Sequence, residues 1–141
     1  MNNEKKEEKV LLFTYGSLKK GFENSDFLAD QTYLGEADTA NEGFIMVSLG
    51  GFPAVCKYDV EWHVKGEIYE VDQRGLAYLD ELESNGSLYT RSQEQFVLNG
   101  KTVTAWIYLM PAQLAMRVMS QNKRYSGSHI VQKAGNSLVW T

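Results

Sequence analysis

The sequence has little of several residue types, and each shortage excludes a class of protein. It contains one cysteine, Cys56, so no disulfide can form within the chain, which fits a reducing compartment. Lysine and arginine number 14 against 18 aspartates and glutamates, which gives a formal net charge of −4. Nucleic-acid binding usually needs a clustered basic face. We therefore expect neither a disulfide framework nor a nucleic-acid partner.

Long apolar runs are also missing. No run approaches the ~20 residues that a helix needs to span a bilayer. The first nine residues, MNNEKKEEK, are charged and have no apolar centre, which a signal peptide requires. We predict that residues 1–9 form a disordered charged tail, and that the protein is cytoplasmic with no membrane partner.

Candidate metal ligands are scarce. The two histidines, His63 and His129, have no metal-ligand spacing to each other or to Cys56. A structural or surface role is the simpler interpretation for each histidine, and a buried small hydrophobe is the simpler one for the cysteine. We predict no metal site.

Length and composition fit one globular domain. The chain has 141 residues, of which 43% are hydrophobic and 23% charged, close to the globular average. At this length roughly two-thirds of the unfolded surface can be buried, so no covalent or metal cross-link is needed. We predict a single domain over residues 10–141.

Strand patterns dominate the first half of the domain. Residues 10–15, VLLFTY, form a short apolar run bounded by Gly16, which is typical of a buried strand. Residues 63–71, HVKGEIYEV, alternate as a half-buried strand does. Weaker strand patterns are predicted at residues 32–34, 44–47 and 54–58.

The pattern then changes. Asp72 is a good N-cap for a helix over residues 73–83, which Asn85-Gly86 ends. A β-hairpin follows over residues 89–110, because Asn99-Gly100 is the strongest short hairpin signal.

Two further segments are less regular. A short helix is predicted at residues 113–119, after Pro111. The tail from Ser120 is polar and interrupted by glycine, and we assign no element to it.

Strands thus outnumber helices, with about six or seven strands and two or three short helices expected. This mixture favours an α+β fold over a doubly wound parallel sheet. We predict a mixed, strongly curved β-barrel with a few flanking helices.

Glu83 stands out on the predicted helix. With Leu76 at 0°, Leu79 lies at about 300° and Glu83 at about 340°, inside the apolar stripe. Desolvation and the negative end of the helix dipole would both raise its pKa towards the range useful for acid–base catalysis. A glutamate near a helix C-terminus also often turns to water or pairs with a lysine. Asp80 and Glu81 are expected to be ordinary surface charges.

The loop after the first strand is a second candidate. It consists of Tyr15, Gly16, Ser17 and Leu18. The loop that follows a strand is a common ligand site, and successive backbone N–H groups can bind an anion. A simple strand-ending turn is the alternative interpretation.

Together these segments resemble the γ-glutamylcyclotransferase family, in its γ-glutamylamine or AIG2-like branch. The match runs from about residue 10 to residue 110. The segments that carry it are Phe13-Thr14-Tyr15-Gly16-Ser17-Leu18, Gly51-Phe52-Pro53-Ala54, Gly66-Glu67-Ile68-Tyr69, Leu79-Asp80-Glu81-Leu82-Glu83 and Leu88-Tyr89-Thr90-Arg91.

The resemblance implies a reaction without metal or cofactor. The α-amine of a γ-glutamyl amide attacks its own γ-carbonyl, which yields 5-oxoproline and a free amine. Glu83 is implied to be the general acid/base, and the loop from Tyr15 to Leu18 to bind the substrate. Tyr125 matches a late tyrosine that lines the pocket in some branches, although a packed or exposed tyrosine is the alternative.

The sequence also departs from the family pattern. Ser84 follows Glu83, where many relatives have glycine, and residues 120–141 have little clear match. The alternative to an enzyme is a binding module for a γ-glutamyl or pyroglutamyl ligand, or a regulator that binds another protein through the same fold. We expect a small-molecule γ-glutamyl amide as partner and a monomer or weak homodimer.

Overall fold

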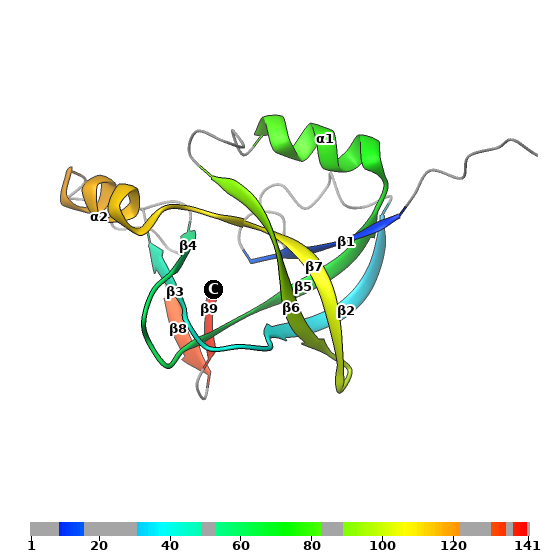
Figure 1. Cartoon of the computed structure of the whole chain (residues 1–141), viewed down its shortest axis with the longest axis horizontal. Helices are drawn as coiled ribbons and strands as arrows, with labels where there is room; N and C mark the ends of the chain where they lie inside the picture. The colour runs from blue at the N-terminus through cyan, green and yellow to red at the C-terminus, as the bar shows by residue number, and fades with distance from the viewer. Residues whose placement is uncertain are drawn as a thin grey trace, which may run out of the picture.

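Five strands of the computed structural model form a closed barrel (Figure 1). The structure describes residues 9–15, 31–48, 53–82, 89–121, 131–134 and 137–140. The strand order is β1-β7-β6-β2-β5, and pairing of β1 with β5 closes the circle. The barrel strands are β1 (Val10–Thr14), β2 (Thr32–Thr39), β5 (His63–Val71), β6 (Thr90–Leu98) and β7 (Lys101–Leu109).

The barrel is mixed, as predicted. Strands β1 and β7 run parallel, with Leu12 opposite Trp106. The other barrel pairs, β1–β5, β2–β5, β2–β6 and β6–β7, are antiparallel. The predicted curved barrel with flanking helices is therefore confirmed.

A separate hairpin packs against one end of the barrel. It consists of β3 (Phe44–Ser48) and β4 (Pro53–Lys57), which pair antiparallel. The backbone N–H of Met110, just after β7, donates to the carbonyl of Val55 at 2.9 Å. This hydrogen bond joins the hairpin to the end of β7.

The hairpin between β6 and β7 forms where the sequence predicts it. Asn99 and Gly100 both have positive φ, 52° and 78°. A two-residue turn of this type needs positive φ at both positions, which asparagine and glycine tolerate best. Leu98 accordingly pairs with Lys101.

Two helices flank the strands. The first, α1 (Gln73–Leu82), is capped by Asp72, whose Oδ1 accepts a hydrogen bond from the Gly75 N–H at 2.7 Å. The second, α2 (Ala112–Gln121), begins after Pro111. Within the described ranges, no helix has the length and apolarity to cross a membrane.

The C-terminal segment holds two strands that we did not predict. They are β8 (Val131–Ala134) and β9 (Ser137–Trp140), which form an antiparallel pair. Strand β9 also runs parallel to the start of β5, at His63 and Val64. Four-residue strands carry too little pattern to recognise, and their pairing depends on a strand far away in the sequence.

Alternation along the strands separates two buried clusters. Phe13 of β1 stacks on Phe96 of β6, with ring centroids 4.3 Å apart, in an inner cluster shared by the barrel strands. Leu12 points the other way and joins Leu76 and Leu79 of α1 in an outer cluster. The apolar stripe predicted for α1 is thus buried against the outside of the barrel.

Gly66 of β5 lies where β1 leaves no room for a side chain. A Cβ atom at this position would lie 2.2 Å from the Thr14 carbonyl oxygen and 2.7 Å from the Phe13 ring. Only glycine allows the two strands to approach this closely.

Candidate functional site

Most of the predicted site residues fall outside the part of the chain that the structure describes. Tyr15 is the described member of the set. The others are Gly16, Ser17, Leu18, Glu83 and Tyr125. Their roles stay predictions. The structure does describe the strand that precedes Gly16, Ser17 and Leu18 and the helix that precedes Glu83.

Tyr15 directly follows β1 and is buried, with 8% of its surface exposed. Its hydroxyl donates a hydrogen bond to the carbonyl oxygen of Tyr108 at 2.6 Å. The phenol therefore joins the end of β1 to β7. A substrate contact by Tyr15 through its backbone stays a prediction.

Tyr108 is bound at both ends. Its carbonyl accepts from Tyr15, and its own hydroxyl donates to Oδ1 of Asp80 at 2.7 Å. Tyr108 is 4% exposed, and its hydrogen bond with Tyr15 is buried, where such a bond is stronger than in water, whereas the one to Asp80 is partly buried.

Asp80 is not the ordinary surface charge that the sequence suggested. Arg91 of β6 donates to it twice, from Nε to Oδ1 at 2.8 Å and from Nη2 to Oδ2 at 3.0 Å. Its side chain is 25% exposed and that of Arg91 is 20% exposed. The angular position of Asp80, about 40° from Leu76, places it beside the apolar stripe and was the signal that we did not use.

Arg91 is also supported from its other side. Its guanidinium carbon lies 4.1 Å from the ring centroid of Trp106. The planar guanidinium thus stacks on an aromatic face while it binds a carboxylate in the two-pronged geometry that arginine favours.

These contacts bring together the ends of two elements that the sequence analysis selected. Tyr15 directly follows β1, and Asp80 lies in the last turn of α1. Both bind Tyr108. Tyr108 therefore links the residue before Gly16 to the helix that precedes Glu83 in the sequence.

Two more of the family-like segments meet at the same end of the barrel. The Tyr89 hydroxyl donates to the carbonyl of Pro53 at 3.2 Å, and Tyr89 is buried. This contact joins the start of β6 to the start of β4. Segments that are far apart in the sequence thus converge on one side of the barrel.

Tyr69 is the most strongly perturbed phenol on the neighbouring strand. Burial raises its pKa to about 12, and the negative charge of Glu67 and a hydrogen bond with it add to the effect. Tyr33 packs on Tyr69 with ring centroids 5.3 Å apart, and burial, followed by Glu67 and Glu36, raises its pKa as well. Both phenols are therefore neutral at physiological pH.

The described residues offer little for metal or thiol chemistry. Among them no group of three or more histidine, cysteine, aspartate or glutamate side chains could hold a metal ion. His63 Nδ1 lies 2.8 Å from the Thr39 carbonyl, as expected for a structural histidine. Cys56 is fully buried, and burial raises its pKa to about 11. A protonated, inaccessible thiol is a poor nucleophile.

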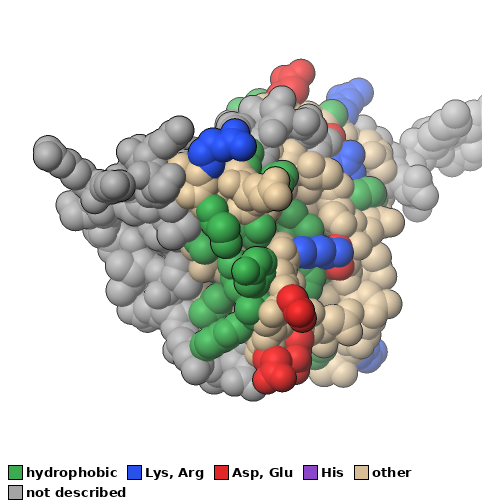
Figure 2. Space-filling model, turned by 60° about the vertical axis from the view of Figure 1, so that its left-hand side comes forward, with side chains coloured by type: hydrophobic (Ala, Val, Ile, Leu, Met, Phe, Trp, Pro, Cys, Tyr) green, Lys and Arg blue, Asp and Glu red, His purple; other side chains and the backbone are tan. Residues whose placement is uncertain are grey.

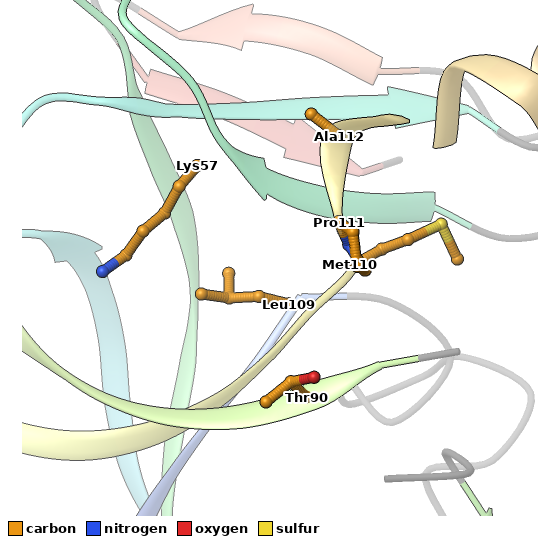
Figure 3. Close-up of a pocket in the computed structure, with 6 residues that line it drawn as sticks. All are labelled: Lys57, Thr90, Leu109, Met110, Pro111 and Ala112. Atoms are coloured by element: carbon orange, nitrogen blue, oxygen red, sulfur yellow. The ribbon is translucent and has the colours of Figure 1, made fainter. Parts of the chain in front are cut away.

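A small pocket lies between β4, the first residue of β6 and the start of α2 (Figure 3). Its volume is about 200 Å³. Lys57 at its border forms an ion pair with Glu94, with Nζ and Oε2 2.7 Å apart. The lining residues are Lys57, Thr90, Leu109, Met110, Pro111 and Ala112.

The same side of the molecule carries an apolar area. The side with α2, β3 and β4 comes forward in Figure 2, where hydrophobic side chains gather near the middle of the face. Acidic and basic side chains border this area. The pocket and the apolar area therefore lie on the side of β4 and α2, whereas Asp80 belongs to α1.

A sequence model of the family described as γ-glutamyl cyclotransferase, AIG2-like, matches residues 12–129. The match extends beyond residue 110, where our sequence-based comparison ended. It stops before β8 and β9.

Individual relatives agree with the family match. A Methanocaldococcus jannaschii protein named as a candidate γ-glutamylcyclotransferase is 34% identical over 119 residues, which are 82% of this chain and 98% of the relative. A rat γ-glutamylaminecyclotransferase is 37% identical over 92 residues, 60% of this chain and 61% of the relative.

A solved structure supports the fold. The crystal structure of a mouse AIG2-like protein superimposes with a TM-score of 0.63 at 26% identity, and the match covers 72% of this chain and 77% of that one.

Proposed function

This chain belongs to the AIG2-like γ-glutamyl cyclotransferase family, and from this premise we propose that it converts γ-glutamyl amides into 5-oxoproline and a free amine. The observation that supports the proposal best is that Tyr15 and Asp80 both bind Tyr108. One residue, Tyr108, thus links the strand that precedes the proposed substrate-binding loop to the helix that precedes the proposed base.

The reaction needs one proton carrier and no external nucleophile. The substrate α-amine forms a C–N bond with its own γ-carbonyl carbon, and the original amide C–N bond breaks. Glu83 takes a proton from the α-ammonium group and later gives one to the departing amine. Because nucleophile and electrophile belong to the same molecule, much of the entropy cost of bringing them together is already met.

The loop after β1 is proposed to hold the substrate. Backbone N–H groups of Gly16, Ser17 and Leu18 can bind a carboxylate or the oxyanion that develops on the γ-carbonyl. Tyr125 is proposed as a further residue of the pocket wall. The Tyr15 hydroxyl donates to Tyr108, and we propose that Tyr15 contributes to binding through its backbone.

The leaving amine defines the substrate class. The name of the rat relative indicates γ-glutamylamines for that protein. We propose the same class here, namely a small or peptide-linked amine joined to the γ-carboxyl of glutamate. The proposal includes action in the cytoplasm as a monomer or weak homodimer.

The test is an assay for 5-oxoproline with a panel of γ-glutamyl-ε-lysine, γ-glutamyl amino acids and glutathione. The control is Glu83→Gln, which keeps the shape of the side chain but cannot act as the base. We expect release by the wild type, at least a hundredfold loss in the variant, and the highest rate with γ-glutamyl-ε-lysine.

Absence of release from every substrate would contradict the enzymatic proposal. Binding of 5-oxoproline by such an inactive protein, measured by calorimetry, would then indicate a binding module.

A further inference from the structure

The carboxylate of Asp80 accepts three hydrogen bonds from side chains of other elements. Three donors surround it: Arg91 Nε at 2.8 Å, Arg91 Nη2 at 3.0 Å and the Tyr108 hydroxyl at 2.7 Å. They come from two strands, β6 and β7, whereas Asp80 lies in the last turn of α1. The carboxylate therefore fixes the end of the helix against two adjacent barrel strands.

The partners of Asp80 are themselves held in place. Arg91 stacks on Trp106 at 4.1 Å, and Arg91 pairs with Tyr108 across the β6–β7 ladder. Tyr108 is almost completely buried. Because neither partner side chain can move freely, the three hydrogen bonds define one position for the end of α1.

The location of this contact gives it a functional meaning. Asp80 lies three residues before Glu83. The carbonyl oxygen of Tyr108 also accepts a hydrogen bond from the hydroxyl of Tyr15, and Tyr15 is the residue before Gly16. The buried Tyr108 thus binds both the residue that precedes the proposed substrate-binding loop and the helix that precedes the proposed base.

We propose that Asp80, bound by Arg91 and Tyr108, is a positioning residue that holds the last turn of α1 against β6 and β7, and that catalysis by Glu83, three residues further along the chain, depends on this contact. The catalytic part of this inference rests on the proposed function. Asp80 itself does not touch substrate or exchange a proton.

The expected effect follows from how strongly catalysis depends on geometry. A misplacement of about 1 Å can reduce a rate by roughly a hundredfold. We expect substrate binding by the loop after β1 to depend less on the position of the last turn of α1 than the catalytic rate does. Loss of the Asp80 contacts should therefore lower kcat much more than it raises KM.

Three variants remove the contacts separately. Asp80→Asn keeps the size and an oxygen acceptor for Tyr108 but loses the charge that Arg91 binds. Arg91→Lys keeps the charge but loses the planar two-pronged donor. Tyr108→Phe removes one hydroxyl and leaves the ring in place.

The matched control is Asp38→Asn. Asp38 is also a partly buried aspartate in an ion pair, with Lys65 Nζ 2.9 Å from its Oδ1 and 34% of its side chain exposed. It joins β2 to β5 and contacts neither α1 nor Tyr108 in the described residues. It also accepts a hydrogen bond from the Ser137 hydroxyl, so Asp38→Asn reports what the loss of a comparable set of contacts away from α1 does to stability.

The variants are compared by steady-state kinetics at a temperature where all are folded. We expect kcat of Asp80→Asn and Arg91→Lys to fall by about tenfold to a hundredfold while KM changes by less than about threefold. Tyr108→Phe should show a smaller loss in kcat, and Asp38→Asn should keep the wild-type kcat. If Asp80→Asn retains kcat within twofold, or if Asp38→Asn loses as much, the inference is overturned.

A second measurement separates this inference from the proposed function. Amide hydrogen exchange is followed in α1 for the wild type, Asp80→Asn and Asp38→Asn. We expect at least tenfold faster exchange at the last turn of α1 in Asp80→Asn only. If the wild type releases no 5-oxoproline, the proposed function fails, and the exchange result decides whether Asp80 holds the helix end. Unchanged exchange in Asp80→Asn overturns the inference in either case.

Discussion

Gly66 shows how a single residue determines how closely two strands of the barrel can pack. The missing side chain lets the Thr14 carbonyl and the Phe13 ring approach where a Cβ atom would clash at 2.2 and 2.7 Å. The carbonyl belongs to the β1 backbone, which cannot move away without breaking its pairing with β5. The glycine of the family-like segment is therefore required by packing.

The change Gly66→Ala is expected to destabilise the fold strongly. Overpacking of this kind costs about 2–3 kcal/mol of unfolding free energy, because β1 and β5 must separate. Urea denaturation measures the loss. Gly100→Ala is the control, because it meets no atom within 4 Å and costs only about 1 kcal/mol for its positive φ. Equal losses at both positions would contradict the packing argument.

Cys56 makes the stability of the protein sensitive to alkaline pH. Burial raises its pKa from 9.0 to about 11 in the folded state. As the pH rises, the thiol loses its proton in the unfolded chain before it does so in the folded one. The contribution of the folded thiol to the free energy of unfolding is therefore complete below pH 9 and is lost as the pH rises to about 11.

We expect the wild type to lose unfolding free energy between pH 9 and pH 11 and Cys56→Ala to lose less over this window. At pH 7.5 the variant should be about 1 kcal/mol less stable, since it buries less apolar volume. Urea titrations at pH 7.5, 9, 10 and 11 test this. Parallel curves for the two proteins would show that the thiol does not cause the alkaline loss.

At the scale of elements, α1 is the best example of a helix determined by local signals. Asp72 accepts the Gly75 N–H at 2.7 Å, and Leu76 and Leu79 face the outer cluster. The N-cap and the apolar spacing were both visible in the sequence, and both are confirmed. Because α1 leads to Glu83, its stability bears on the proposed active site.

Loss of the cap should weaken α1 measurably. Asp72→Ala is expected to cost about 1 kcal/mol of unfolding free energy, because the first-turn N–H groups lose their acceptor. Thermal and urea denaturation measure the effect. Asp59→Ala, at an exposed position outside any helix or strand, should change stability by less than about 0.5 kcal/mol. A smaller loss for Asp72→Ala than for the control would rule out a stabilising cap.

At the scale of the whole molecule, β8 and β9 form an addition to the barrel. Strand β9 pairs with two residues of β5, and the Ser137 hydroxyl donates to Oδ2 of Asp38. Leu138 packs against the inner cluster. The family match ends at residue 129, so this addition lies beyond the part shared with the family model.

Removal of residues 135–141 should therefore destabilise the protein without abolishing the proposed activity. The loss of the β9 contacts and of the partly buried leucine should cost about 2 kcal/mol. Unfolding free energy and 5-oxoproline release per folded molecule test the two parts. A folded truncated protein without activity would place the C-terminal segment in the active site.

Local patterns in the sequence were sufficient for much of the fold. The buried first strand, the Asn99-Gly100 hairpin and α1 each depend on neighbouring residues, whose backbone preferences and spacing can be read directly. The excess of strands over helices then favoured a curved mixed sheet. The roles of Glu83, Gly16, Ser17, Leu18 and Tyr125 stay predictions, because these residues lie outside the described structure.

Only the tertiary structure decided how distant segments meet. Strands β1 and β5 close the barrel, and β9 pairs with β5. Asp80 is bound by Arg91 and Tyr108. Each of these contacts joins different elements of the chain. Periodicity assigns a residue to a face of its own element, but the partner on that face depends on how the barrel closes. For this reason Asp80 resembled a surface charge in the sequence, whereas in the folded protein it is partly buried and bound by Arg91 and Tyr108.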